Sequence, residues 1–124
     1  MATFMDTIKA KLVSSGAASG YTVFIGYMND DPDTAIGLAP TGGFPQDTLG
    51  NENVGGTFQV KIRAGAKDYD TAVQKWNAVF AALQDATDIS GVSLIQALAS
   101  EPMVVYDGRN RPNAILNMRY IRSR

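Results

Sequence analysis

The chain contains 124 residues, of which 45% are hydrophobic and 19% are charged, and its formal net charge is −1. This length suits a single domain, the apolar share excludes a disordered chain, and no apolar run reaches the roughly 18 residues that a membrane-spanning helix requires. The absence of cysteine and histidine excludes disulfides, thiolate nucleophiles, zinc sites of the Cys/His type and histidine-dependent catalysis.

The first forty residues are predicted to form one helix and two strands. Residues 2–14 carry apolar side chains three and four apart, which predicts an amphipathic helix. They lack the basic-then-apolar order of a signal peptide, so synthesis in the cytoplasm is expected. Residues 21–27 read YTVFIGY, a composition typical of a strand that is covered on both faces or paired at the centre of a sheet. The Asp-rich and proline-containing stretch 28–33 predicts a turn, and residues 34–39 predict a short strand.

A glycine-rich segment is followed by the clearest strand of the chain. Residues 40–56 hold two prolines and five glycines, and we expect them to form one long exposed loop with a functional role. Residues 57–65 alternate strictly between apolar and polar side chains, which predicts a strand with one buried and one polar face. The two sets are Phe58, Val60 and Ile62 on the buried face, and Gln59, Lys61 and Arg63 on the polar face.

The second half of the chain predicts a long helix and three further strands. Asp68 or Asp70 is suited to cap a helix whose apolar stripe runs to Leu83 and should cover the buried face of strand 57–65. Trp76 lies within that stripe and is expected in the core. The three strands are predicted over residues 92–99, 103–106 and 114–121, with a hairpin beginning at Asp107 and Gly108.

The order of these elements is α-β-β-β-α-β-β-β. It predicts a single α+β domain over residues 1–124, with a mostly antiparallel, mixed sheet and both helices packed on one face.

Charge is distributed unevenly along the chain. Residues 1–60 carry two lysines against six acidic residues, whereas the last sixteen residues carry five arginines and no acid. This asymmetry is compatible with a nucleic-acid face or with a basic face that meets an acidic one on a neighbouring subunit. The low total charge favours the second interpretation. The strand pattern also divides the arginines, because Arg119 shares a face with Asn117 and Arg122 shares the other face with Tyr120.

Few residues form a chemically suggestive cluster. Asp30, Asp31 and Asp33 lie close together, but they lack the spacing of a calcium loop, so an acidic surface turn is favoured over a cation site. The glycine pairs lack the following lysine and serine or threonine of a phosphate-binding loop. Carboxylate-based catalysis is left open, and it would need a pocket that holds two acids with shifted pKa values. We expect no catalytic residue, cofactor or metal. Sheet packing is favoured over an interface role for Tyr21, Tyr27, Tyr106 and Tyr120.

Nearly the whole chain resembles the tail terminator or minor capsid (head-tail joining) proteins of long-tailed bacteriophages. The resemblance rests on the order of landmarks rather than on one motif. These landmarks are Ile25-Gly26, the turn Asp31 to Asp33, Gly42-Gly43, the strand Gln59 to Arg63, the helix start Tyr69-Asp70 with Ala72, and the hairpin from Glu101-Pro102 to Gly108-Arg109.

This resemblance implies a structural role in virion assembly. Family members form rings, typically hexameric, that cap the tail tube, stop its growth and offer a surface for joining the head. The implied partners are further copies of the chain, the tail-tube protein and a head-completion or connector protein, and DNA passes through the lumen without specific binding. The implied location is the tail or neck of a virion assembled in the host cytoplasm. The family supplies no catalytic residue.

The polar strand face and the uneven charge then suggest contact residues for a head-to-tail ring. The candidates at the subunit or tube interface are Gln59, Lys61, Arg63, Asp47, Glu52, Arg109, Arg111, Arg119 and Arg122. Asp47 and Glu52 are further candidates for lining the channel. The alternative function is a small nucleic-acid-binding module that uses the basic C-terminal strand from Arg109 to Arg124.

Overall fold

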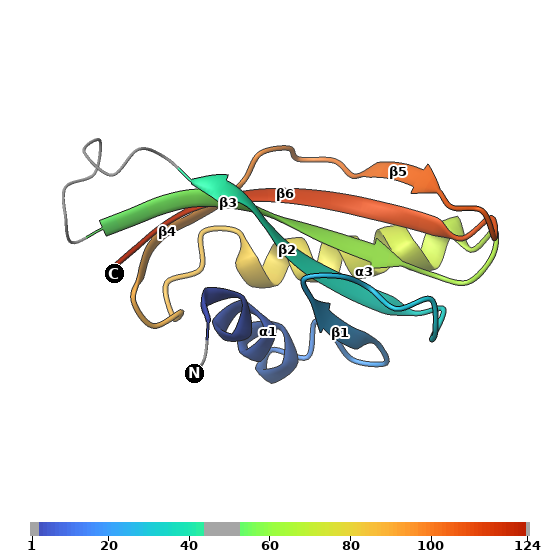
Figure 1. The fold of residues 1–124 in the computed structure, drawn as a ribbon, viewed down its shortest axis with the longest axis horizontal. Helices are drawn as coiled ribbons and strands as arrows, with labels where there is room; N and C mark the ends of the chain where they lie inside the picture. Colours follow the sequence, from blue (N-terminus) through green and yellow to red (C-terminus); the bar gives the residue numbers. More distant parts are fainter. Residues whose placement is uncertain (1–2, 44–52, 124) are drawn as a thin grey trace.

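The computed structural model describes residues 3–43 and 53–123 of the chain. They form two helices and six strands in one α+β domain, which confirms the predicted class and element order. Both helices lie on the same face of the sheet (Figure 1). Within the described ranges, neither helix is long and apolar enough to cross a membrane. The elements are α1 (Phe4–Ser14), β1 (Thr22–Ile25), β2 (Ala35–Gly43), β3 (Asn53–Arg63), α3 (Tyr69–Leu83), β4 (Val92–Ala97), β5 (Met103–Tyr106) and β6 (Pro112–Ser123).

The sheet is mixed, with one parallel pair at its edge. The strand order is β1-β2-β3-β6-β4, and β5 also pairs with β6. Only the pair β1 and β2 is parallel among the described strands. β5 pairs with residues 112–115 of β6 and β4 with residues 118–122, so the two short strands lie one after the other along the same edge of β6.

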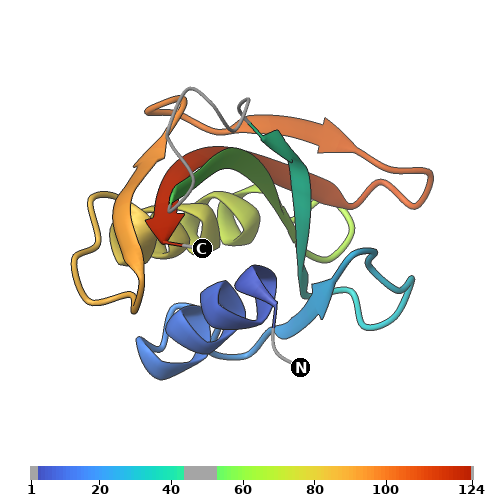
Figure 2. The ribbon, with the colours of Figure 1, turned by 60° about the vertical axis from the view of Figure 1, so that its left-hand side comes forward.

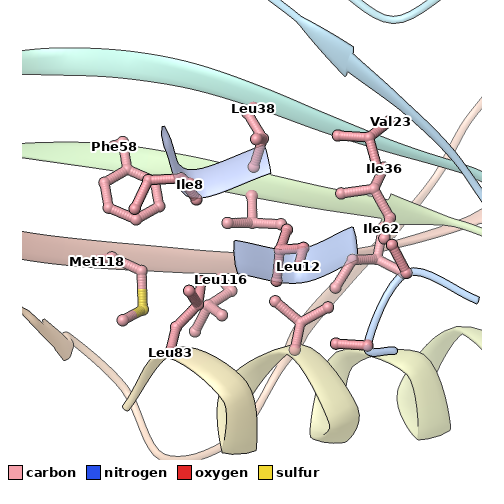
Figure 3. Packing of buried hydrophobic residues seen from close by; sticks show 14 of the residues in the cluster. Ile8, Leu12, Val23, Ile36, Leu38, Phe58, Ile62, Leu83, Leu116 and Met118 are labelled. Atoms are coloured by element: carbon pink, nitrogen blue, oxygen red, sulfur yellow. The ribbon is translucent and has the colours of Figure 1, made fainter. Parts of the chain in front are cut away.

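The core fills the space between the sheet and the two helices. Phe58, Val60 and Ile62 are fully buried, as their alternation predicted. Figure 3 shows Leu12 of α1 and Leu83 of α3 lying against the same face of the sheet. Trp76 is buried among these side chains, and its indole Nε1 donates a hydrogen bond to the carbonyl of Ile115 at 3.0 Å, because a buried N–H needs a partner.

Each helix begins at a capping residue that the sequence supplies. Thr3 caps α1, and its backbone N–H donates to the Asp6 carboxylate at 2.7 Å while its hydroxyl accepts from the Asp6 N–H at 3.4 Å. Asp68, rather than Asp70, caps α3 by accepting from the N–H of Thr71 at 3.3 Å. These contacts satisfy backbone donors that the first turn of a helix leaves free.

The expectation of one loop over residues 40–56 is wrong at both of its ends. β2 continues to Gly43 and β3 begins at Asn53, while residues 44–52 lie outside the described part of the chain. The glycines allow two backbones to approach closely, since a Cβ at Gly56 would lie 2.7 Å from the carbonyl oxygen of Gly42. The glycine-rich composition on either side of residues 44–52 therefore reflects tight packing of β2 against β3.

Two other strands differ from their predicted bounds or burial. β1 is shorter than the predicted 21–27 because Gly26 has a φ of +91° and leaves the strand conformation. It is an edge strand with Thr22 and Ile25 exposed, so the expectation of a strand covered on both faces or paired centrally is wrong. β6 is longer than predicted, since it begins at Pro112 and reaches Ser123.

Candidate functional site

Arg63 extends from the outer face of β3, opposite the helices, and binds the connection between β1 and β2. Its guanidinium donates to four backbone carbonyls, those of Asn29 (2.7 Å), Asp30 (3.3 Å), Pro32 (2.6 Å) and Asp33 (3.0 Å). Alternation correctly placed Arg63 on the outer face, but the side chain is buried beneath this connection. Its expected contact with a neighbouring subunit or the tube therefore does not fit its position.

Arg111 is the centre of a network of ion pairs. Its guanidinium lies 2.7 Å from the Asp30 carboxylate, 3.1 Å from that of Asp33 and 2.9 Å from that of Asp107. The Arg111 residue is 3% exposed. Arg109 adds an exposed ion pair with Asp30 at 2.8 Å. The network joins the connection between β1 and β2 to the hairpin between β5 and β6.

Two carboxylates of this network, those of Asp30 and Asp107, have lowered pKa values. Hydrogen bonding from Arg111 is the main cause that lowers the pKa of Asp30. Burial raises the pKa of Asp107, but the backbone N–H groups of Arg111 and Arg109, together with the Arg111 guanidinium, outweigh it, so that this pKa is lowered. Burial lowers the pKa of Arg111, and hydrogen bonds to Asp30, Asp107 and Asp33 raise it above its ordinary value.

The acidic turn therefore acts as a partner for arginine. No group of three or more acidic side chains in residues 3–43 and 53–123 is arranged to hold a metal ion. The uneven charge of the sequence is balanced at least partly within the chain, because Asp30 and Asp33 pair with Arg111. These three side chains are therefore not free for a contact between subunits, and the expectation that opposite charges meet there stays a prediction for the other charged residues. Sequence alone held no signal for this pairing, since the partners are about eighty residues apart.

The other candidate contact residues occupy both sides of the sheet. Gln59 and Lys61 lie on the outer face, where Gln59 donates a hydrogen bond to Asn117 at 3.2 Å. Arg119 is exposed on the same face and donates to the side-chain oxygen of Gln96 at 3.2 Å. Arg122 lies over the ring of Phe4, which packs against the core, with 5.3 Å to the ring centroid. Asp47 and Glu52 lie outside the described residues.

A group of exposed apolar side chains was not identified from the sequence. We call this group the outer patch. Its members are Tyr27 (75% exposed), Leu98 (55%), Met103 (58%), Val105 (49%) and Tyr106 (50%). The sequence of β5, MVVY, contained a signal for this exposure. It has no charged or strongly polar residue on either face, yet only Val104 of β5 packs against the core.

Two hollows adjoin the outer patch. One, of about 530 Å³, lies between the β1–β2 connection and β5 and is lined by Tyr27, Lys61, Val105 and Tyr106 among others. The second, of about 320 Å³, is lined by Leu98 and Met103 among others. The preference for sheet packing holds for Tyr120, which is buried against Phe4, and fails for Tyr27 and Tyr106. Large exposed apolar patches are a common feature of surfaces that contact other macromolecules.

Comparison with known proteins identifies the family. A family model described as bacteriophage tail terminator protein matches residues 6–110. The chain belongs to the bacteriophage tail terminator family. This membership confirms the resemblance derived from the landmarks and makes the chain a structural tail protein, located in the tail or neck of a virion.

The tail terminator fold also occurs in a solved particle. A chain from the virion of the native gene transfer agent (GTA) particle superimposes with a TM-score of 0.73 at 17% sequence identity, and the match covers 94% of this chain and 92% of that chain. At this identity the likeness shows a shared fold. No curated protein sequence matches the chain significantly.

Proposed function

We propose that this protein caps the phage tail tube as a ring, stops tail growth and provides the surface to which the head is joined. The match to the tail terminator family over residues 6–110 is the observation that carries this proposal. Its partners are then further copies of the chain, the tail-tube protein and a head-completion or connector protein. DNA passes through the lumen of the ring without base-specific contacts.

The free face of the sheet supports an assembly role. Both helices pack on one face, and the opposite face carries polar side chains such as Gln59 and Arg119 beside the outer patch. A polar rim around apolar side chains is the composition of protein–protein contacts. The half-buried Gln59 and Lys61 and the exposed Arg109 and Arg119 remain proposed contact residues on this account.

The geometry gives less support to binding nucleic acid through the C-terminal strand. Arg111 is buried in ion pairs, Arg109 pairs with Asp30, and Arg122 covers Phe4. Phosphate binding needs accessible cations, and four of the five arginines that suggested it already have partners in the chain, since Arg119 donates to Gln96. Asp30 and Asp107 adjoin a hollow, but both have lowered pKa values as partners of arginine, which is unlike a proton donor poised near neutral pH.

The oligomeric state in the presence of tail tubes tests the proposal. The protein would be studied alone and with polymerised tail-tube protein of the same phage, by native mass measurement and negative-stain imaging. We expect a hexameric ring, free in solution or seated at one tube end, and unmodified tube ends in samples without the protein. A monomer at all concentrations, together with unmodified tube ends in the mixture, would contradict the proposal.

A further inference from the structure

Two short edge strands lie at the same level on opposite sides of the sheet. One row of paired residues crosses five strands, from Phe24 through Gly37, Lys61 and Ile115 to Met103. The neighbouring row connects Val23 with Val104 in the same way through Ile36, Ile62 and Ala114. β1 and β5 have four residues each and therefore form the two ends of one section of sheet (Figure 2).

The outer edge of β5 is open and carries none of the usual protections. In an antiparallel pair, successive residues of a strand direct their backbone N–H and C=O groups alternately toward the partner strand and away from it. The N–H of Asp107 donates to the carbonyl of Arg111 at 3.1 Å, so Asp107 faces the partner strand. Val104 and Tyr106 therefore direct their N–H and C=O groups away from β6. Within the described residues, no strand pairs with that edge. β5 contains no charged residue and no proline, the features with which proteins normally block an exposed edge.

The edge of β4, the other strand on this side of the sheet, is covered by hydrogen bonds from the end of α3. The side-chain oxygen of Gln84 accepts a hydrogen bond from the N–H of Ala97 in β4 at 2.6 Å. The N–H of Asp85 donates to the carbonyl of Ile95 in the same strand at 3.0 Å. The end of α3 thus closes the β4 half of the edge, while the β5 half stays open.

Strand directions determine what fits this open edge. β1 is parallel to β2, and each later step from β2 to β3, β6 and β5 is antiparallel, so β1 and β5 run in opposite directions. When a second copy of the chain is rotated about an axis that runs along the strands, its strands keep the same directions as those of the first copy. A rotated second copy therefore presents its β1 antiparallel to β5 of the first, at the same level of the sheet.

We propose that β5 of one subunit pairs with β1 of the next, so that the sheet continues from subunit to subunit around the ring. This inference rests on the proposed ring function and names the surface that builds the ring. The contact uses different edges on its two sides, which is the head-to-tail arrangement that closes into a ring. The apolar side chains of Met103 and Val105 then pack beside the joined strands.

Cysteine cross-linking tests the pairing without background, because the chain has no cysteine of its own. Two double variants, Phe24→Cys with Met103→Cys and Phe24→Cys with Val105→Cys, cover the two registers that keep these side chains on one face. Facing cysteines in adjacent antiparallel strands come within the distance of a disulfide. We expect one variant, oxidised after assembly, to give a ladder of covalent oligomers up to the ring on a non-reducing gel.

The control pairs Met103→Cys with Val13→Cys, which places the second thiol on an exposed position of α1. It should give no species larger than a dimer. A second measurement needs no disulfide. Val105→Lys should raise the concentration at half assembly at least about tenfold, because a charge on an edge strand opposes pairing. Val13→Lys, at a similarly exposed position, should leave it unchanged.

The outcomes separate this inference from the function on which it rests. Wild-type rings without a covalent ladder, and with unchanged assembly of Val105→Lys, would overturn the pairing and leave the ring intact. Cross-links to the tail-tube protein in place of a second copy would also overturn it. Absence of any wild-type ring, alone or on tubes, would contradict the proposed function itself.

Discussion

The guanidinium of Arg111 lies 2.7 Å from the carboxylate of Asp30, 81 residues away in the sequence. This pair joins the hairpin after β5 to the connection after β1. The two segments follow the two edge strands that we propose to meet between subunits. The ion-pair network therefore fixes the geometry of the surfaces on which the assembly account depends.

Removal of Arg111 should destabilise the protein much more than removal of its exposed neighbour. Arg111→Ala removes a buried guanidinium that binds three carboxylates, and we expect a loss of about 2–4 kcal/mol in the free energy of unfolding. Arg109→Ala removes an exposed pair and should cost about 0–1 kcal/mol. Urea unfolding followed by tryptophan fluorescence measures both values. Equal losses would contradict the network described here.

Stability should fall in acid because Asp30 and Asp107, two carboxylates of the network, have lowered pKa values. A carboxyl group whose folded pKa is lowered contributes stability that is complete above its unfolded pKa, here the ordinary aspartate value of 3.8. That contribution is lost as the pH falls through the folded value. The free energy of unfolding should thus be level from neutral pH to near 4 and decline below it. In Asp107→Asn the free energy of unfolding should decline less steeply below pH 4. An unchanged dependence on pH would show that the Asp107 carboxylate does not contribute to the loss of stability in acid.

The close contact between β2 and β3 predicts that substitution by alanine destabilises the protein at Gly56 but not at Gly65. A Cβ at Gly56 would lie 2.7 Å from the Gly42 carbonyl oxygen and 2.9 Å from the Tyr120 hydroxyl, so Gly56→Ala should cost about 1–3 kcal/mol. Gly65 has no atom within 4 Å of the corresponding position, and Gly65→Ala should be neutral or slightly stabilising. Thermal unfolding of the two variants compares them. If both are tolerated, the strands are not packed as described.

The buried indole of Trp76 predicts a cost for its replacement by a smaller ring without a donor. Trp76→Phe removes the indole N–H that binds the Ile115 carbonyl and part of the buried side-chain volume, and we expect a loss of about 1–3 kcal/mol. Tyr69→Phe removes a polar atom from a half-exposed position of the same helix and should change stability by less than about 0.5 kcal/mol. Chemical unfolding followed by circular dichroism is suitable, since the first variant removes the only tryptophan.

Local periodicity was sufficient to predict most of the fold. Hydrophobic periodicity indicates which face of a helix or strand is buried. The alternation around Phe58 and the helical stripe around Trp76 therefore predicted the buried faces of β3 and α3 correctly. The predictions were wrong where long-range contacts decided the outcome. Gly56 is required by the approach of another backbone, and Arg63 is buried by a connection that packs over it. Neither effect leaves a pattern in neighbouring residues.

The candidate contact surface was predicted less well for the same reason. Charge counting indicated complementary halves, but the ion pairs of Arg111 lie inside the chain. The apolar strand Met103–Tyr106 was predicted as a strand, while its exposure depends on its place at the edge of the sheet. Strand order is a property of the whole fold, and the sequence of one strand does not contain it.

Elongation of tail tubes is the most direct test of the proposed terminator activity. Preformed tubes of the phage's own tail-tube protein would be incubated with this protein, washed, and supplied with fresh tube subunits, and their lengths would be measured by electron microscopy against untreated tubes. The account predicts that treated tubes carry a ring at one end and do not lengthen from that end. Treated tubes that lengthen at both ends as fast as untreated tubes would contradict it.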